Sequence, residues 1–482
     1  MGPSTVERVC DRLIYGFFIS ILFVTPFVYN KYMDASVAFR RPKQTAFGIL
    51  CALIITTWLV KYIEAGDYSF FKKLKSLKGW RHVFSSNPYA APATMLVIAC
   101  LLSLNNAASQ YYYWDTAAVV FAAMITSFIL TNVIGDNYKR LLSFIIFICL
   151  TGSFMGGYCM LQYYGADPLF VPRKAEYEGR TVASGFIDNP NTVSGYLVAV
   201  MPIVLSFFFV ARRPWARALA IIGPIGMLGG LLSACTRGAL IAGVFAILVF
   251  LALVFLRSRY KRGEKKMIAI WAAVVGGFVI FYLAINPYIV HRIANTGDVL
   301  NLRQNTRYVE WASGKRMIAD HFLIGLGLGN YKYYYLDYRG DAAREIEFIG
   351  RWEKANQAHN EYVQVASELG FLGLFSMLWL IGAFVWLAFR AVMRIKKALP
   401  HLPDDEVDVE QRRANLLNGL MGGLLGLAGH CAFMFPLHIV PSGVVGAYIL
   451  ALAYSLVRMP REALMPASAL ATQKPQTRGR GR

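Results

Sequence analysis

The chain has 482 residues, of which 56% are hydrophobic, and its formal net charge is +21. A soluble protein is only about 45–50% apolar, so this composition excludes an ordinary soluble protein of several domains. The apolar residues come in blocks of about 20, the length of helix that crosses the hydrocarbon core of a bilayer. In a membrane protein, the positive-inside rule explains the excess of Lys and Arg more simply than nucleic-acid binding does.

Twelve apolar segments follow one another along the chain, and we predict a membrane-spanning helix in each. They are 13–30, 44–61, 91–108, 116–134, 141–162, 192–210, 217–235, 239–256, 267–286, 371–391, 415–434 and 440–457. No small-residue cleavage site follows the first segment, so we expect an uncleaved span rather than a signal peptide. The expected fold is an all-α polytopic membrane protein, with nine spans in residues 1–286 and three in residues 371–457.

The basic residues lie mainly in alternate loops, which share a side with both termini because the number of spans is even. Examples are Lys72 and Lys73, Lys139 and Arg140, and Arg212 and Arg213. The positive-inside rule makes that side cytoplasmic. Residues 458–482 are polar and basic, and we expect a disordered cytoplasmic tail there.

The longest polar interruption, residues 287–370, lies on the opposite, outer side. Residues 287–358 contain ten Lys and Arg and eight Asp and Glu, so the charges of the segment are nearly balanced and it is not simply polybasic. Loops this long are usually functional or disordered, and the many Trp and Tyr here argue against disorder. We therefore predict one large, partly helical outer loop that brings functional side chains to the mouth of a membrane cavity.

His359 is the first candidate for catalysis, just before the tenth span. A histidine accepts a proton near neutral pH, which suits a general base. If a helix begins at His359, Glu361 and Glu368 point away from the imidazole, because helical neighbours are three or four residues apart. A partner that orients the ring must then come from elsewhere. The alternative is a histidine that only hydrogen-bonds a loop carbonyl or a helix end.

Arg237 is the second candidate, in the very short outer connection that precedes the eighth span. An ionisable side chain at the membrane boundary is costly and marks a candidate functional site. The start of a helix offers free N–H groups to an anion, and a guanidinium matches phosphate in bidentate fashion. Together they predict a phosphate or pyrophosphate site. The alternative is an arginine that reaches the lipid headgroups.

Further candidates lie elsewhere on the predicted outer side. Asn189 and Pro190 suit the N-cap and first residue of the sixth span, and Asn191 is a candidate for lining the cavity. On a helix near 305–320, Arg307 and the more distant Lys315 and Arg316 are candidates for binding phosphate, although a solvated face explains them as well. The histidines His430 and His438 are rivals to His359 as the general base. Four basic residues of the first outer loop are candidates for binding an anionic donor, namely Lys31, Arg40, Arg41 and Lys43.

Two sequence patterns bear on cofactors and backbone. The spacing Gly325-x-Gly-x-Gly329 follows no βαβ pattern, so it favours a tight turn with close backbone contacts over a dinucleotide site. The sequence contains no HExxH, DxD or Walker motif. We therefore predict a reaction that uses no cofactor, metal or ATP.

The combination of these motifs resembles the bacterial O-antigen ligase and O-antigen polymerase superfamily, which includes some protein O-oligosaccharyltransferases. The resemblance rests on about twelve spans and on the order and spacing of five motifs. These are Asn189-Pro190-Asn191, Thr236-Arg237-Gly238-Ala239, Arg307-x3-Trp311, Gly325-x-Gly-x-Gly-Asn330-Tyr331 and His359-Asn360-Glu361-Tyr362 with Glu368-Leu369-Gly370.

The resemblance implies a multi-pass protein of the bacterial inner membrane, with both termini cytoplasmic and its active site facing the periplasm. It implies transfer of O-antigen from undecaprenyl pyrophosphate to a terminal sugar of the lipid A–core. His359 matches the family histidine proposed to deprotonate the acceptor hydroxyl, and Arg237 the arginine proposed to hold the pyrophosphate. Arg307 is a second phosphate contact on the same grounds.

Three alternatives stay open. A polymerase often has two sizeable outer loops, whereas this chain has one long loop and a modest one at 163–191. A protein O-oligosaccharyltransferase often has an extra C-terminal region that is not evident here. A secondary transporter or flippase would fit twelve spans, but it predicts internal repeats that we do not find. The ligase is therefore our preferred expectation, with inversion at the anomeric carbon because no convincing nucleophilic carboxylate is found.

Overall fold

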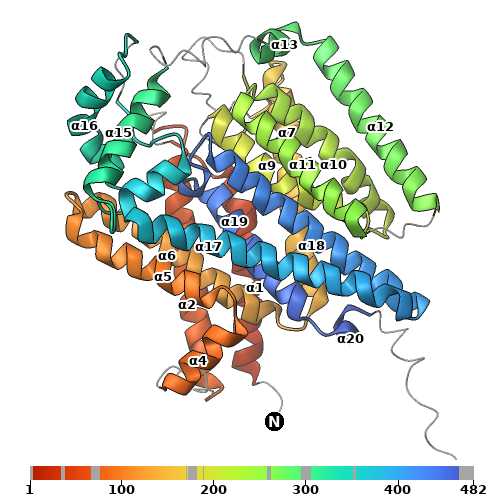
Figure 1. The fold of residues 1–482 in the computed structure, drawn as a ribbon. Coiled ribbons are helices and arrows are strands. Elements are labelled where there is room, and N and C mark those ends of the chain that lie inside the picture. The colour runs from red at the N-terminus through yellow and green to blue at the C-terminus, as the bar shows by residue number, and fades with distance from the viewer. Residues whose placement is uncertain are drawn as a thin grey trace, which may run out of the picture.

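The computed structural model describes residues 4–33, 38–66, 76–169, 171, 182–187, 189–257, 262–294, 305–350 and 354–465. Within these ranges the regular elements are all helical (Figure 1). The long helices are α1 (Thr5–Phe27), α2 (Arg40–Glu64), α5 (Ala90–Ser103), α6 (Gln110–Ile134), α7 (Tyr138–Tyr163), α9 (Pro190–Phe207), α10 (Pro214–Ser233), α11 (Arg237–Arg257), α12 (Arg262–Ala284), α17 (Glu361–Ala398), α18 (Asp404–Cys431) and α19 (Val440–Arg458). The shorter ones are α4 (Leu77–Ser86), α13 (Pro287–Ala294), α15 (Thr306–Asp320), α16 (Tyr331–Glu345), α20 (Arg461–Leu464) and the 3₁₀ turns η1 (Leu104–Asn106), η2 (Leu399–His401) and η3 (Pro436–His438).

Each of the twelve predicted spans coincides with one long helix. Among the described residues, nine helices are long and apolar enough to cross a membrane. The other three are α5, which is short, α12, whose described apolar part is short, and α18, which begins with the acidic residues Asp404, Asp405 and Glu406. The chain is thus a multi-pass membrane protein whose described regular elements are all helices. The predicted tail lies mostly outside the described residues.

Ion pairs and hydrogen bonds join the helix ends that the topology places on the basic side. Asp11 of α1 binds both Lys61 near the end of α2 and Arg140 near the start of α7. Arg212, just after α9, pairs with Asp408 at the start of α18. These contacts agree with the alternation of basic loops read from the sequence.

Small residues let neighbouring helices approach closely within the bundle. A Cβ added to Gly156 of α7 would lie 2.5 Å from Cα of Met227 in α10, and one added to Gly423 of α18 would lie 2.4 Å from the carbonyl oxygen of Ala199 in α9. Because lipid tails are as apolar as a leucine side chain, close van der Waals packing of this kind holds membrane helices together. These contacts hold α9 and α18 in a fixed relation, and both helices contribute to the candidate site.

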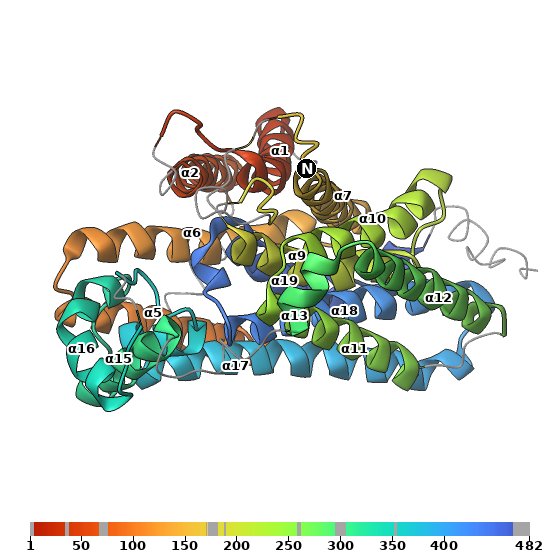
Figure 2. The same ribbon diagram turned by 90° about the horizontal axis from the view of Figure 1, so that it is seen from above.

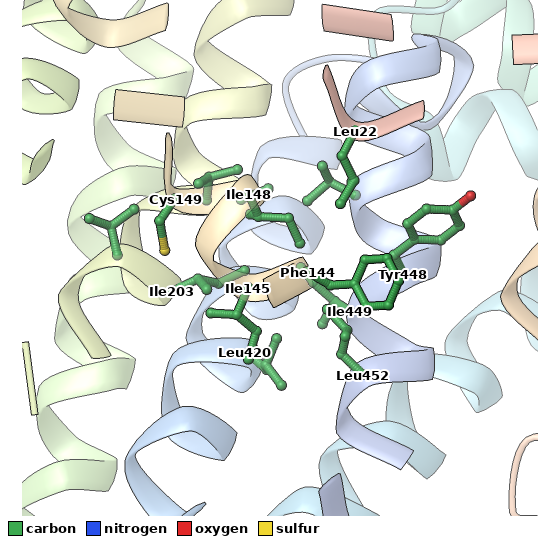
Figure 3. Close-up of a cluster of buried hydrophobic side chains, with 14 of the residues drawn as sticks. Leu22, Phe144, Ile145, Ile148, Cys149, Ile203, Leu420, Tyr448, Ile449 and Leu452 are labelled. Atoms are coloured by element: carbon green, nitrogen blue, oxygen red, sulfur yellow. The ribbon is translucent and has the colours of Figure 1, made fainter. Parts of the chain in front are cut away.

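The core lies where α1, α7, α9, α18 and α19 meet. Figure 3 shows Leu22, Phe144, Ile148, Leu420 and Tyr448 converging from four of these helices. Each of them is at most 3% exposed. This packed centre supports the site end of α18 and α19.

The helices α15 and α16 form a compact unit at one end of the bundle, beside α5, α6 and the start of α17 (Figures 1 and 2). The helix expected near 305–320 is α15. The predicted interval 287–370 also contains α13 and the first turns of α17.

The glycine-rich turn joins this unit to a break in α17. Gly325 has a φ of +69°, and a Cβ there would lie 2.4 Å from the carbonyl oxygen of Glu368. The N–H groups of Leu326 and Gly327 donate to the carbonyls of Ser367 and Glu368 at 2.9 Å. In α17 the backbone turns at Gly370, whose φ is +65°. The predicted tight turn with close backbone contacts is confirmed.

Candidate active site

His359 lies in the turn just before α17 and not within it. Asn360 is the N-cap, and its side-chain oxygen accepts from the N–H groups of Tyr362 and Val363. The helix therefore begins at Glu361, after His359, because the Asn360 side chain accepts hydrogen bonds from its first N–H groups. The condition of a helix that starts at His359 is not met. His359 has a φ of +48°, in the left-handed region that most side chains avoid. Strain of this kind clusters at functional sites.

The His359 ring is held on two sides. Its Nδ1 lies 2.9 Å from Oε2 of Glu310 in α15, and its ring contacts Phe435 edge to face at 5.2 Å between centroids. The imidazole is 31% exposed and the Glu310 side chain 6% exposed. The ring is therefore oriented by protein groups yet still open to a substrate.

The segment 432–438 between α18 and α19 is the common support of the site, and we call it the 432–438 connection. The Asn360 amide donates to the carbonyl of Ala432 at 3.1 Å, and the N–H of Glu361 donates to the carbonyl of Met434 at 3.0 Å. With the Phe435 ring, these bonds attach the His359 turn to the connection.

Arg237 begins α11 beside the same connection. A Cβ added to Gly238 would lie 2.6 Å from Cβ of Phe433, so the first turn of α11 packs directly on it. The Thr236 hydroxyl donates to Ser194 of α9 at 2.8 Å, which fixes the approach to this helix end. His359 and Gly238, the residue after Arg237, thus pack on Phe435 and Phe433 of one short segment, although 122 positions separate His359 and Arg237 in the sequence (359 − 237).

Arg307 and Asn191 approach the same end of α18. His430 Nε2 donates to the carbonyl of Asn191 at 3.2 Å, and Arg307 lies close enough to His430 for an electrostatic interaction. Burial lowers the pKa of the Arg307 guanidinium, an effect that the nearby Glu310 carboxylate opposes. A half-buried guanidinium of this kind is well placed to bind an anion from which water is excluded. As predicted, Asn189 caps α9, and Pro190 is its first residue.

The other basic candidates lie apart from His359. Lys315 and Arg316 both pair with Glu345 of α16, at 3.5 and 3.0 Å, and their side chains are 78% and 39% exposed. Lys43 is 3% exposed, and its ammonium group donates to the carbonyls of Pro26 and Val28 at 2.8 Å. It therefore satisfies the end of α1, where carbonyls have no helical partner.

Arg40 belongs to a second basic group at the start of α2. Burial and the neighbouring Arg40 guanidinium lower the pKa of Lys332 to about 8. Lys332 lies over the Tyr112 ring, 3.5 Å from its centroid, and the adjacent Arg41 pairs with Asp115 at 2.7 Å. Lys31 is another candidate from the first outer loop. Its ammonium group lies over the ring of the adjacent Tyr32, 5.2 Å from the centroid.

The part of the chain that carries Arg237, Arg307 and His359 is similar to a known family. Residues 224–378 match the family model described as O-Antigen ligase. Over these residues the chain is similar to the O-antigen ligase/polymerase superfamily. No curated protein gives a significant match to the chain.

The O-antigen ligase match covers Arg237, Arg307 and His359, but neither Asn191 nor the 432–438 connection. It also covers Glu310, which the sequence reasoning missed. Glu310 was one of eight acidic residues between 287 and 358, and nothing in their spacing distinguished it. Glu310 lies three residues after Arg307, so on the expected helix the two side chains share a face. That shared face was the one signal in the sequence that could have placed Glu310 near the site.

The two rival histidines are largely withdrawn from the surface. His430 is 1% exposed, and the His438 side chain is 12% exposed. His438 Nδ1 lies 2.7 Å from Oε1 of Glu361, and its Nε2 lies 3.8 Å from Oε2 of Glu368. As predicted, Glu361 and Glu368 do not orient His359, because both face His438. Burial alone would lower the pKa of His438, but the two carboxylates outweigh it and raise that pKa to about 10.

This cluster predicts a loss of stability in alkaline solution. The folded protein holds the His438 proton more tightly than the unfolded chain does, so this stabilisation is complete below pH 6.5 and disappears as the pH rises through about 10. We expect the thermal midpoint of the detergent-solubilised protein to fall more steeply between these pH values than that of His438→Gln. Equal slopes for the two proteins would contradict the assignment.

Proposed function

We propose that this protein transfers an O-antigen glycan from undecaprenyl pyrophosphate to a terminal sugar of the lipid A–core. The family supports a glycan-transferring enzyme of the ligase/polymerase class. The observation that supports the finer proposal is that the His359 ring contacts Phe435 and that Gly238, next to Arg237, packs on Phe433 of the same 432–438 connection. A lipid-linked pyrophosphate donor needs both, one for the acceptor hydroxyl and one for the leaving group.

The chemistry follows from these groups. Nε2 of His359 takes the proton of the acceptor hydroxyl, and the hydroxyl oxygen forms a bond to the anomeric carbon. The bond between that carbon and the pyrophosphate oxygen breaks, and the pyrophosphate leaves with its negative charge. Arg237, the N–H groups at the start of α11, and Arg307 stabilise this charge as it develops. A single displacement of this kind inverts the anomeric configuration.

The side of the membrane follows from the distribution of charge. The loops rich in Lys and Arg lie at the helix ends opposite the His359 and Arg237 turns. With the basic side cytoplasmic, the site faces the periplasm, and the protein belongs in the bacterial inner membrane. The acceptor and the lipid-linked donor then reach the site from the outer leaflet.

The deciding experiment is glycan transfer by the purified protein, without ATP or added metal. The donor is an undecaprenyl-pyrophosphate oligosaccharide, and the acceptors are lipid A–core, a second lipid-linked glycan and an acceptor protein, each offered separately. We expect transfer to lipid A–core with inverted anomeric configuration. Transfer only between lipid-linked glycans would make the enzyme a polymerase, and transfer only to protein an O-oligosaccharyltransferase. If the protein moves the donor across the vesicle membrane without any glycan transfer, the result would favour a flippase.

A further inference from the structure

Glu310 is a buried carboxylate directly behind His359. The residue is 5% exposed, and its Oε2 lies 2.9 Å from Nδ1 of the imidazole. Removing a carboxylate from water is costly unless it is paired or hydrogen-bonded, so a buried acid at this place requires a specific partner. Within the described part of the chain, the hydrogen-bond partner of the Glu310 carboxylate is His359.

The position of Glu310 is fixed by packing of α15 on α17. A Cβ added to Gly314 would lie 2.3 Å from Cγ1 of Val363, so the two helices are in direct contact there. The Ser367 hydroxyl donates to the Gly314 carbonyl at 3.3 Å, and the Tyr331 hydroxyl donates to the Glu310 carbonyl at 2.7 Å. These contacts hold the carboxylate at a set distance from the His359 turn.

This geometry selects one form of the imidazole. A carboxylate only accepts hydrogen bonds, so Nδ1 carries the proton and donates it to Glu310. The lone pair is then on Nε2, which has no hydrogen-bond partner among the described residues. The Phe435 ring and the φ of +48° restrict the ring further.

We propose that Glu310 is the positioning residue of the His359 base: it keeps Nε2 unprotonated and directed at the acceptor, and stabilises the imidazolium that forms. This inference rests on the proposed function, because it gives His359 the role of the base. When Nε2 takes the proton of the acceptor hydroxyl, the ring becomes a cation, and the Glu310 carboxylate neutralises it. The carboxylate itself takes no proton.

A structural role is the competing explanation, since Glu310 also interacts electrostatically with Arg307. The variant Glu310→Gln separates the two. Its amide keeps the size of the side chain and can donate to Nδ1, which places the proton on Nε2 and leaves the ring in the wrong form for a base. We expect kcat to fall by about 10²–10⁴-fold, as when an orienting carboxylate becomes an amide. KM for the donor and the thermal midpoint should stay close to their wild-type values.

Two further variants sharpen the test. Glu310→Asp keeps the carboxylate and should retain clearly more activity than Glu310→Gln. Glu345→Gln, a matched change on the exposed side of α16, should behave as wild type. The double variant Glu310→Gln/His359→Ala should be no slower than His359→Ala alone, because Glu310 acts only through His359.

The outcomes distinguish this inference from the proposed function. If His359→Ala abolishes transfer while Glu310→Gln keeps the wild-type kcat, Glu310 does not position the base, and the proposed function stands. If Glu310→Gln loses activity in step with its thermal midpoint, the residue serves folding and the inference is overturned. If His359→Ala is fully active, both the proposed role of His359 in transfer and the inference on Glu310 are overturned.

Discussion

Replacing His359 with alanine is expected to lower the rate of glycan transfer by about 10²–10⁴-fold, the usual contribution of a positioned general base. The acceptor hydroxyl then has no group to take its proton as the new bond forms. The loss should lie in kcat, because in the proposed reaction the imidazole acts on the acceptor hydroxyl and not on the lipid carrier. Initial rates with saturating lipid-linked oligosaccharide and lipid A–core measure it.

The matched control is His401→Ala. His401 is an exposed histidine in η2, after the end of α17 that is opposite His359. We expect this variant to transfer glycan at the wild-type rate. Full activity of His359→Ala would remove His359 from the mechanism, and the buried His430 and His438 would not replace it without a rearrangement of their packing.

Replacing Arg237 with alanine is expected to lower transfer by about 10²–10³-fold, the effect of removing one group that stabilises charge in a transition state. In the proposed reaction the pyrophosphate gains negative charge as the glycosidic bond breaks, and Arg237, the first residue of α11, stabilises that charge. Arg237→Lys keeps the charge but not the bidentate geometry, so its rate should lie between those of alanine and wild type. The measurement is kcat and the donor KM for each variant.

Arg394→Ala is the control for the loss of one arginine. Arg394 is exposed near the end of α17 that is opposite the site. The Arg394→Ala variant should leave kcat and the donor KM unchanged. If Arg237→Ala raises only the donor KM and keeps kcat, Arg237 binds the carrier equally in the ground and transition states, and its role in catalysis is excluded.

Local features were predictable because short stretches of sequence carry them. Each apolar segment of bilayer length became a helix, since a backbone in lipid must satisfy its own hydrogen bonds. The N-cap at Asn189 with Pro190 after it, and the tight turn from Gly325 to Gly329, follow from the conformational preferences of those residue types. His359 and Arg237 were found because each is a polar residue at the edge of an apolar helix.

The partners of these residues were decided by the tertiary structure. Glu310 meets His359 across 49 positions of sequence, and only the packing of α15 on α17 places it there. The same sequence reasoning grouped Lys43 with Arg40, yet Lys43 turns back to the carbonyls at the end of α1. A side chain at a helix end has several acceptors within reach, and the arrangement of neighbouring helices selects one.

Taken by itself, the sequence determined that the chain is a helical membrane protein and that a histidine and an arginine lie next to the starts of two of its helices. These properties depend on hydrophobicity, helix periodicity and capping, which are local. Only the tertiary structure decided that the starts of α11 and α17 share the 432–438 connection and that Glu310 supports the histidine. Those contacts depend on how distant helices pack, and close packing at small residues such as Gly238 and Gly314 sets that arrangement.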